Sequence, residues 1–157
     1  MAQEPDDLFK ELEQCVIDDM RRVHSEQTVD HFLNPRNLGR ISSPDGVGRI
    51  TDLHGSTMEI YLKVKDDKVI HTSFWTDGCG CSIASGSIIT ELVKGKSVSE
   101  AQKITDQDVL DALGGLPKDD LHCAVLATST LKEAIKDYLT FKRDQWKRAY
   151  KSDRDLK

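Results

Sequence analysis

Long hydrophobic runs and an excess of positive charge are both missing from this sequence. No apolar stretch approaches the roughly 18 residues that a membrane-spanning helix needs, and the acidic N-terminus MAQEPDDLFKELEQ fits neither a signal peptide nor a transit peptide. The net charge of −5 argues against a nucleic-acid partner, because phosphate groups are neutralised by clustered lysine and arginine. We therefore expect a cytoplasmic protein that binds neither a membrane nor nucleic acid.

Cysteine is also scarce, with four residues in a chain of 157. In a cytosolic protein of this size, so few cysteines favour metal or thiol chemistry over a disulfide framework. Cys15 falls on or beside an apolar helical stripe, which is typical of a structural thiol. Cys79, Cys81 and Cys123 lie where elements are expected to begin or end, so they are the candidates for chemistry.

The length allows one domain with a single hydrophobic core. Apolar residues at helical spacing predict a helix over 7–23, and Ser25 caps a second helix that Pro35 stops. The period then changes to two in VGRITDL (47–53), MEIYLKV (58–64) and KVIHTSFWT (68–76). These segments predict a three-stranded antiparallel meander.

Helical signals fill the remainder of the chain. SIASGSIITELVKG (82–95) ends at a glycine stop, and Ser97 and Thr105 are each followed three residues later by an acidic residue, as in a capping box. A long final helix is expected from about Asp119 to Tyr150. The predicted order is therefore helices, a three-stranded meander and then helices again.

Three separated segments present metal-binding side chains at the ends of expected elements. His54 lies in the first hairpin turn, Cys79 and Cys81 follow the third strand, and His122 and Cys123 occupy the first turn of the final helix. Soft or borderline metal ions bind thiolates and neutral imidazoles, usually four of them. Cys123 would also meet the positive end of the helix dipole, which favours a thiolate. The five residues are candidate ligands, and the spacing alone leaves open whether they converge.

Four segments resemble the IscU, SufU and NifU N-terminal family of iron-sulfur cluster assembly scaffolds. They are VDHFLNPRNLG (29–39), HGSTMEIYLKV (54–64), TDGCGCSIASGSIITELVKGKSVSEAQKI (76–104) and LPKDDLHCAVLATSTLKEAIKDY (116–138). The resemblance implies an α+β fold, with helices packed on one face of a three-stranded antiparallel sheet. It divides the chain into an N-terminal helical extension (1–24), an iron-sulfur scaffold domain (25–150) and a tail (151–157).

Carried over residue by residue, the resemblance gives cluster-binding roles to Cys79, His122 and Cys123. It implies a protein that accepts sulfur from a cysteine desulfurase and iron from a donor. Such a protein assembles a 2Fe-2S cluster and passes it to apo acceptor proteins, as a carrier rather than an enzyme. Cys123 or Cys81 is the expected sulfur acceptor, because attack on a persulfide needs an accessible thiolate.

Three positions depart from the pattern of this family. His54 stands where the family has its first cysteine, and Ser56 replaces an aspartate associated with keeping the cluster labile. Cys81 stands where the family usually has serine or another small residue, so it either replaces the thiol missing at His54 or fills a small buried site. Two imidazoles in place of two thiolates are expected to make the cluster easier to reduce and sensitive to pH.

LPKDD (116–120) departs from the family's chaperone-recognition segment LPPVK, which makes a dedicated chaperone doubtful.

Two further readings of the function remain open. Two cysteines and two histidines also suit zinc, so the chain could be a zinc-binding, SufU-like sulfur-transfer partner of the desulfurase, or a regulator that builds no cluster. His24, His31 and His71 lack a comparable context, and His31 is expected to be a packing residue.

Overall fold

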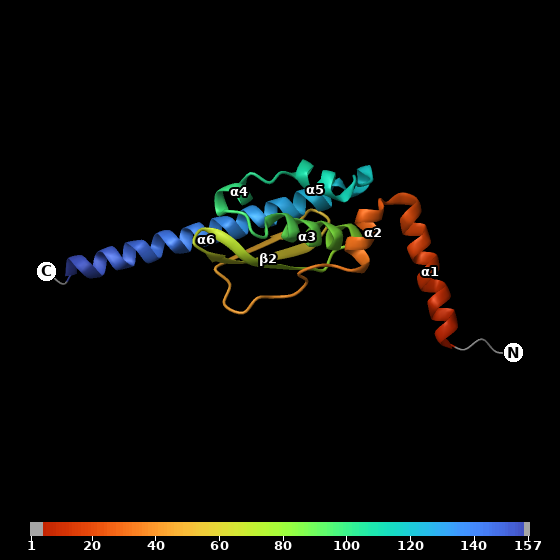
Figure 1. Ribbon diagram of the computed structural model, residues 1–157, viewed down its shortest axis with the longest axis horizontal. Helices are drawn as coiled ribbons and strands as arrows, with labels where there is room; N and C mark the ends of the chain where they lie inside the picture. Colours follow the sequence, from red (N-terminus) through yellow and green to blue (C-terminus); the bar gives the residue numbers. More distant parts are fainter. Residues whose placement is uncertain (1–4, 156–157) are drawn as a thin grey trace.

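The computed structural model describes the backbone of residues 5–155 and the side chains of residues 5–146. Helices lie before and after a small sheet, in the predicted order (Figure 1). The elements are α1 (Pro5–Val23), α2 (Glu26–Leu33), β1 (Gly46–Thr51), β2 (Thr57–Lys65), β3 (Lys68–Thr76), α3 (Gly80–Val93), α4 (Val98–Gln102), α5 (Asp106–Leu113), the 3-10 turn η1 (Lys118–Asp120) and α6 (Leu121–Asp155).

The three strands form an antiparallel meander in the order β1-β2-β3. Ile60 on β2 lies opposite Gly48 on β1 and Phe74 on β3. Met58, Ile60 and Leu62 alternate along β2 toward the core, and each is at most 1% exposed. The alternation of these side chains therefore predicted both the strand and its inner face correctly.

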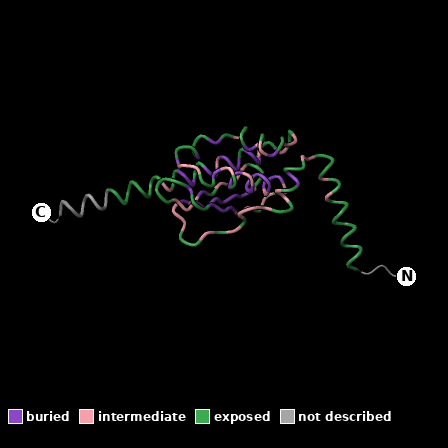
Figure 2. The backbone as a smooth tube through the Cα atoms, in the orientation of Figure 1, coloured by how far each residue is buried: buried purple, intermediate pink, exposed green. Residues whose placement is uncertain are grey.

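Helices α3 and α6 pack on that inner face, with α6 against β1 and β2 and α3 against β3 (Figure 1). Buried residues are concentrated in the layer between helices and sheet (Figure 2). Close packing depends on glycine: a Cβ atom added to Gly48 would lie 2.2 Å from the carbonyl oxygen of Thr130. The backbone of α6 therefore rests directly on β1, and the fold implied by the family resemblance is confirmed.

The opposite face of the sheet is not simply solvated. Glu59 on β2 points there but is only 4% exposed, and Arg40 and Arg49 hold its carboxylate at 3.2 and 3.0 Å. Burial opposes ionisation of Glu59, yet hydrogen bonds from Tyr61 and Arg40 and the charges of both arginines lower its pKa below the usual value. This face of the sheet therefore carries a buried carboxylate that forms ion pairs with two arginines.

Helix α1 has no buried residue and extends away from the sheet and its helices (Figures 1 and 2). Its apolar stripe faces solvent, with Phe9 71% exposed and Leu12 56% exposed. Cys15 on this helix is exposed as well. The interpretation of Cys15 as a structural thiol was therefore wrong, because the apolar stripe that suggested it is not packed against the described part of the chain.

Helix α6 continues to Asp155, beyond the predicted end near Tyr150. The side chains of the tail predicted for residues 151–157 lie outside the described part of the chain. Within residues 5–155, no helix combines the length and apolar character that a membrane crossing needs.

Candidate metal centre

Two thiols from distant segments of the chain meet at one end of the sheet. Cys79 is the N-cap residue of α3, and Cys123 lies in the first turn of α6. Their sulfur atoms are 3.8 Å apart and both cysteines are free. Two thiolates bound to one tetrahedral zinc ion at about 2.3 Å would also lie about 3.8 Å apart. The separation therefore suits two ligands of one metal ion.

Glycines on both sides of Cys79 allow this close approach. A Cβ atom on Gly78 would lie 2.6 Å from the hydroxyl of Ser82, and one on Gly80 would lie 3.1 Å from the ring of Phe32. The backbone NH of Gly78 donates to the Thr76 hydroxyl at 3.1 Å, which tightens the turn after β3. The sequence GCG therefore fixes the position of Cys79 through backbone packing.

His54 and His122 also meet, which the sequence spacing had left open. Their ring centroids are 4.2 Å apart, and the planes are tilted by 37°. His122 Nδ1 lies 2.9 Å from the carbonyl oxygen of Asp119, which can only accept a hydrogen bond. In the neutral imidazole Nδ1 therefore carries the proton, and Nε2 is free for a metal ion. That nitrogen lies 3.6 Å from the sulfur of Cys123.

The turn between β1 and β2 is held in shape by Asp52. One of its carboxylate oxygens accepts the backbone NH groups of His54 and Ser56, each at 2.9 Å. Gly55 between them has a φ of 82°, which glycine adopts without strain. Asp52 therefore positions the exposed imidazole of His54 at the end of the sheet where the thiols lie.

The thiols of this centre differ in ionisation. Partial burial opposes ionisation of Cys79, but hydrogen bonds from the backbone and hydroxyl of Ser82 outweigh it and lower the pKa of Cys79. Burial, together with the neighbouring charge of Cys79, raises the pKa of Cys123 to about 12, although the hydrogen bond from Ser82 opposes this increase. The expectation that a helix start would favour a thiolate at Cys123 is therefore reversed, and Cys79 is the better thiolate.

Cys81 is buried, in line with one of the two alternatives that the sequence left open. It lies in the first turn of α3 and is 5% exposed. Its sulfur lies 3.9 and 4.0 Å from the two ring nitrogens of His24. Burial, followed by the charge of Asp120, raises the pKa of this thiol. Cys81 is thus grouped with His24 and Asp120 rather than with the pair formed by Cys79 and Cys123.

Two residues of this region had no place in the sequence argument. A carboxylate oxygen of Asp120 and the sulfur atoms of Cys79 and Cys123 all lie within 4.8 Å of one another. The hydroxyl of Ser82 is 3.5 Å from the sulfur of Cys123 and 3.8 Å from that of Cys79. The one sequence signal for Asp120 was its position in LPKDDLHC, two residues before His122. For Ser82 there was none.

The described residues therefore gather two thiols, two imidazoles and one carboxylate at the end of the sheet. This borderline-soft donor set fits iron or zinc better than magnesium or calcium, which prefer oxygen ligands alone. Cys79 and His54 are exposed, so a metal held here would remain accessible to another protein.

Known proteins are similar to this chain in both sequence and fold. The family described as NifU-like N terminal domain matches residues 23–145. The iron-sulfur cluster assembly scaffold protein IscU 1 of Archaeoglobus fulgidus is 48% identical over 117 residues, which are 74% of this chain and 76% of the relative. The scaffold protein IscU of Escherichia coli is 42% identical over 121 residues, which are 74% of this chain and 94% of the relative.

Solved structures agree on the fold. The crystal structure of a nitrogen-fixing NifU-like protein (N-terminal) from Brucella abortus superposes with a TM-score of 0.58 at 18% identity, covering 74% of this chain and 94% of that one. The resemblance inferred from the four sequence segments is therefore confirmed. From the family match and the identities to its scaffold relatives, the chain belongs to the NifU-like N-terminal domain family.

Proposed function

We propose that this protein is a scaffold on which an iron-sulfur cluster is assembled and from which it is transferred to other proteins. The observation that carries the proposal is the convergence of Cys79, Cys123 and His122 at an open end of the sheet. Relatives at 42–48% identity bear the name of iron-sulfur cluster assembly scaffolds. The candidate ligands and the family membership therefore both support iron-sulfur cluster assembly.

We assign the ligand roles from the geometry. Cys79 and Cys123 supply thiolates, and His122 offers Nε2 beside Cys123. His54 completes the set from the β1–β2 turn, where its ring contacts that of His122. Two histidine ligands raise the potential of a 2Fe-2S cluster from about −400 mV to between roughly −150 and +300 mV when both bind one iron. A cluster bound in this way is expected to be easier to reduce.

Sulfur delivery requires an ionised thiol that a desulfurase can reach. The thiolate attacks the terminal sulfur of the desulfurase persulfide, the sulfur–sulfur bond breaks, and the desulfurase thiolate leaves. Cys79 is exposed and its pKa is lowered, which suits this step. The acceptor roles expected for Cys123 and Cys81 stay predictions, and they require those buried thiols to become accessible.

The direct test is anaerobic reconstitution with iron(II), cysteine, a cysteine desulfurase and a thiol reductant that converts the delivered persulfide sulfur to sulfide. The wild-type protein and the Cys15→Ser variant should develop visible sulfur-to-iron charge-transfer bands, because Cys15 lies away on α1. The Cys79→Ser variant should lose most of this absorption. Folded wild-type protein that forms no bands, or a Cys79→Ser variant that forms them fully, would contradict the proposal.

A second candidate is a zinc-binding sulfur-transfer partner of the desulfurase. It is favoured by the group of Cys79, Asp120 and Cys123, whose ligand atoms lie close enough for one tetrahedral ion. One tight zinc ion per chain, in protein purified without added iron, would support this candidate.

Four expectations stay predictions from the sequence: the desulfurase, the iron donor, the acceptor proteins and the cytosolic location.

A further inference from the structure

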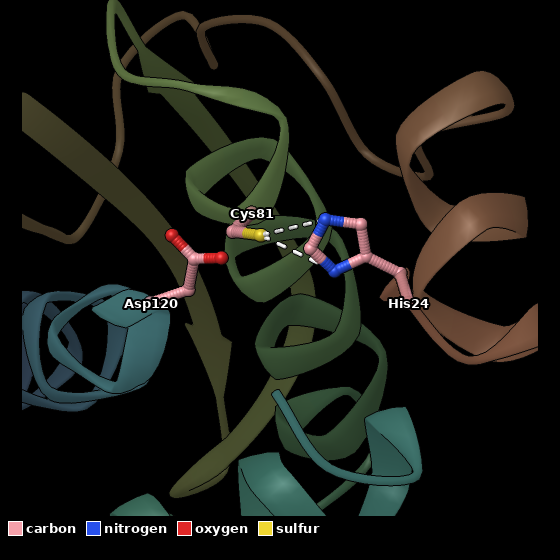
Figure 3. A group of neighbouring side chains, drawn as sticks. All are labelled: His24, Cys81 and Asp120. Atoms are coloured by element: carbon pink, nitrogen blue, oxygen red, sulfur yellow. Dashed lines mark hydrogen bonds between the residues drawn. The ribbon is translucent and has the colours of Figure 1, made fainter. Parts of the chain in front are cut away.

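A second group of metal-binding side chains lies beside the centre described above. His24 is in the link between α1 and α2, Cys81 is in the first turn of α3, and Asp120 ends the turn η1. One ligand atom from each lies within 4.8 Å of the other two. Figure 3 shows the sulfur of Cys81 between the imidazole of His24 and the carboxylate of Asp120. Three segments far apart in the sequence thus converge on one point.

The distances in this group are slightly longer than those between ligands of one bound ion. Zinc binds sulfur at about 2.3 Å, imidazole nitrogen at about 2.0 Å and carboxylate oxygen at about 2.0–2.2 Å, so two ligands of one tetrahedral ion lie about 3.4–3.6 Å apart. The sulfur of Cys81 is 3.9 and 4.0 Å from the two nitrogens of His24, a few tenths of an ångström more. All three separations are at most 4.8 Å, so rotation of the His24 and Asp120 side chains toward the sulfur would bring the ligand atoms onto one ion.

The chemistry of the group selects the ion. One sulfur, one nitrogen and one oxygen form a borderline-soft set, which iron(II) and zinc favour and magnesium and calcium do not. Three protein ligands leave one position of a tetrahedral ion open. The buried thiol of Cys81 binds as a thiolate and releases one proton as the ion enters.

We propose that His24, Cys81 and Asp120 form a second position for one divalent ion of the iron(II) or zinc class. This position adjoins the first centre, because Asp120 also lies within 4.8 Å of the sulfur atoms of Cys79 and Cys123. The proposal goes beyond cluster assembly on the first centre and does not depend on it. It also gives Cys81 a role separate from replacing the thiol missing at His54.

An ion held here would also fix the N-terminal extension to the domain. His24 directly follows the last residue of α1, Val23, and precedes the N-cap of α2, Ser25. Its ligation would tie the α1–α2 link to the start of α3. Bound metal should therefore slow proteolysis in this link, and the slowing should disappear when His24 is replaced.

The test uses cobalt(II) as an optical probe of thiolate ligation, added without oxygen to the full-length chain. In the Cys79→Ser/Cys123→Ser variant the first centre has lost its thiols, so any thiolate-to-cobalt band must come from another cysteine. We expect this variant to bind one cobalt ion with a band for one thiolate. Adding His24→Gln or Cys81→Ser should abolish the band, whereas adding the control change His71→Gln, at an exposed site on β3, should not.

If the double variant does not fold, cobalt(II) titration of proteins that keep Cys79 and Cys123 tests the proposal instead. Wild-type protein and His71→Gln should bind two cobalt ions per chain, and His24→Gln should bind one. Equal stoichiometry in wild type and His24→Gln would overturn the proposal, as would a folded double variant without the band. Neither result would bear on cluster assembly, because that assembly is tested by the loss caused by Cys79→Ser alone.

Discussion

The four cysteines differ in exposure, and this difference should govern how fast each one reacts. Cys79 and Cys15 are exposed, Cys81 is 5% exposed, and Cys123 is fully buried. The pKa of Cys79 is lowered, whereas burial raises that of Cys123 to about 12. Because alkylation proceeds through the thiolate, accessible thiols of low pKa react first.

We therefore expect iodoacetamide to modify Cys79 of the metal-free protein at least about tenfold faster than Cys81 and Cys123. Mass spectrometry of peptides sampled over time measures the four rates. Bound zinc should protect Cys79 but leave Cys15 unchanged, which makes Cys15 an internal control. Cys123 reacting as fast as Cys79 in folded protein would contradict the assigned ionisation.

A pH dependence of stability is expected from His31. Its Nδ1 atom lies 2.7 Å from the hydroxyl oxygen of Ser87, which also accepts the backbone NH of Arg36 at 2.8 Å. Burial, helped by the charge of Arg36, lowers the pKa of His31. The unfolded chain thus binds a proton more readily, so this stabilisation is complete above the ordinary histidine pKa of about 6.5 and is lost as the pH falls below it.

Urea unfolding of the metal-free protein at about pH 7 and about pH 5 measures this effect. The free energy of unfolding of wild-type protein should be lower at the acidic pH than at the neutral pH. In His31→Gln this decrease should be smaller. His71→Gln, at an exposed position on β3, should keep the wild-type difference. A His31→Gln variant with the full wild-type loss would show that other groups carry the dependence.

Some site residues were predictable and others were not, for a physical reason. Cys79, His122 and Cys123 lie in short motifs at helix starts, so local sequence already placed them at element ends. The meeting of His24 with Cys81 depends on the angle between α1 and α2 and on how α2 packs against α3. A single sequence carries no signal for that angle.

At the scale of elements, close contact between α6 and β1 depends on glycine. A Cβ atom on Gly48 would lie 2.2 Å from the Thr130 carbonyl oxygen and 2.6 Å from the Ala134 nitrogen, and both are backbone atoms that cannot rotate away. We expect Gly48→Ala to lower the free energy of unfolding by about 2–3 kcal/mol, the upper end of the usual cost of overpacking.

Chemical denaturation of the metal-free protein measures this change. Lys65→Ala, at the exposed end of β2, serves as a control and should change stability by less than about 0.5 kcal/mol. A Gly48→Ala variant as stable as the control would mean that α6 shifts away from β1 without loss.

The elements themselves were predictable where their signals are local. Ser25, Ser97 and Thr105 each cap the helix that the sequence assigned to them, because capping involves only the next three residues. The direct contact of α6 with Gly48 was not predictable, since the two segments are far apart in the chain. Likewise, the burial of Glu59 depends on Arg40, which lies outside the strands.

At the scale of the whole molecule, the chain combines a packed domain with an exposed N-terminal helix. The sheet and helices α3 and α6 bring the candidate ligands to one end of the domain, while α1 extends from its link to α2 (Figure 1). The second proposed ion lies where that link meets the domain. Metal content and the position of the extension should therefore be coupled.

The central claim is that this protein carries an iron-sulfur cluster on the centre containing Cys79 and Cys123. Its most direct test is the iron, zinc and acid-labile sulfide content of protein isolated entirely without oxygen. We expect iron and sulfide in about equal amounts, as in a 2Fe-2S cluster, and we expect both to be lost in Cys79→Ser and kept in Cys15→Ser. Folded protein that holds zinc without sulfide, or iron and sulfide unaffected by Cys79→Ser, would contradict it.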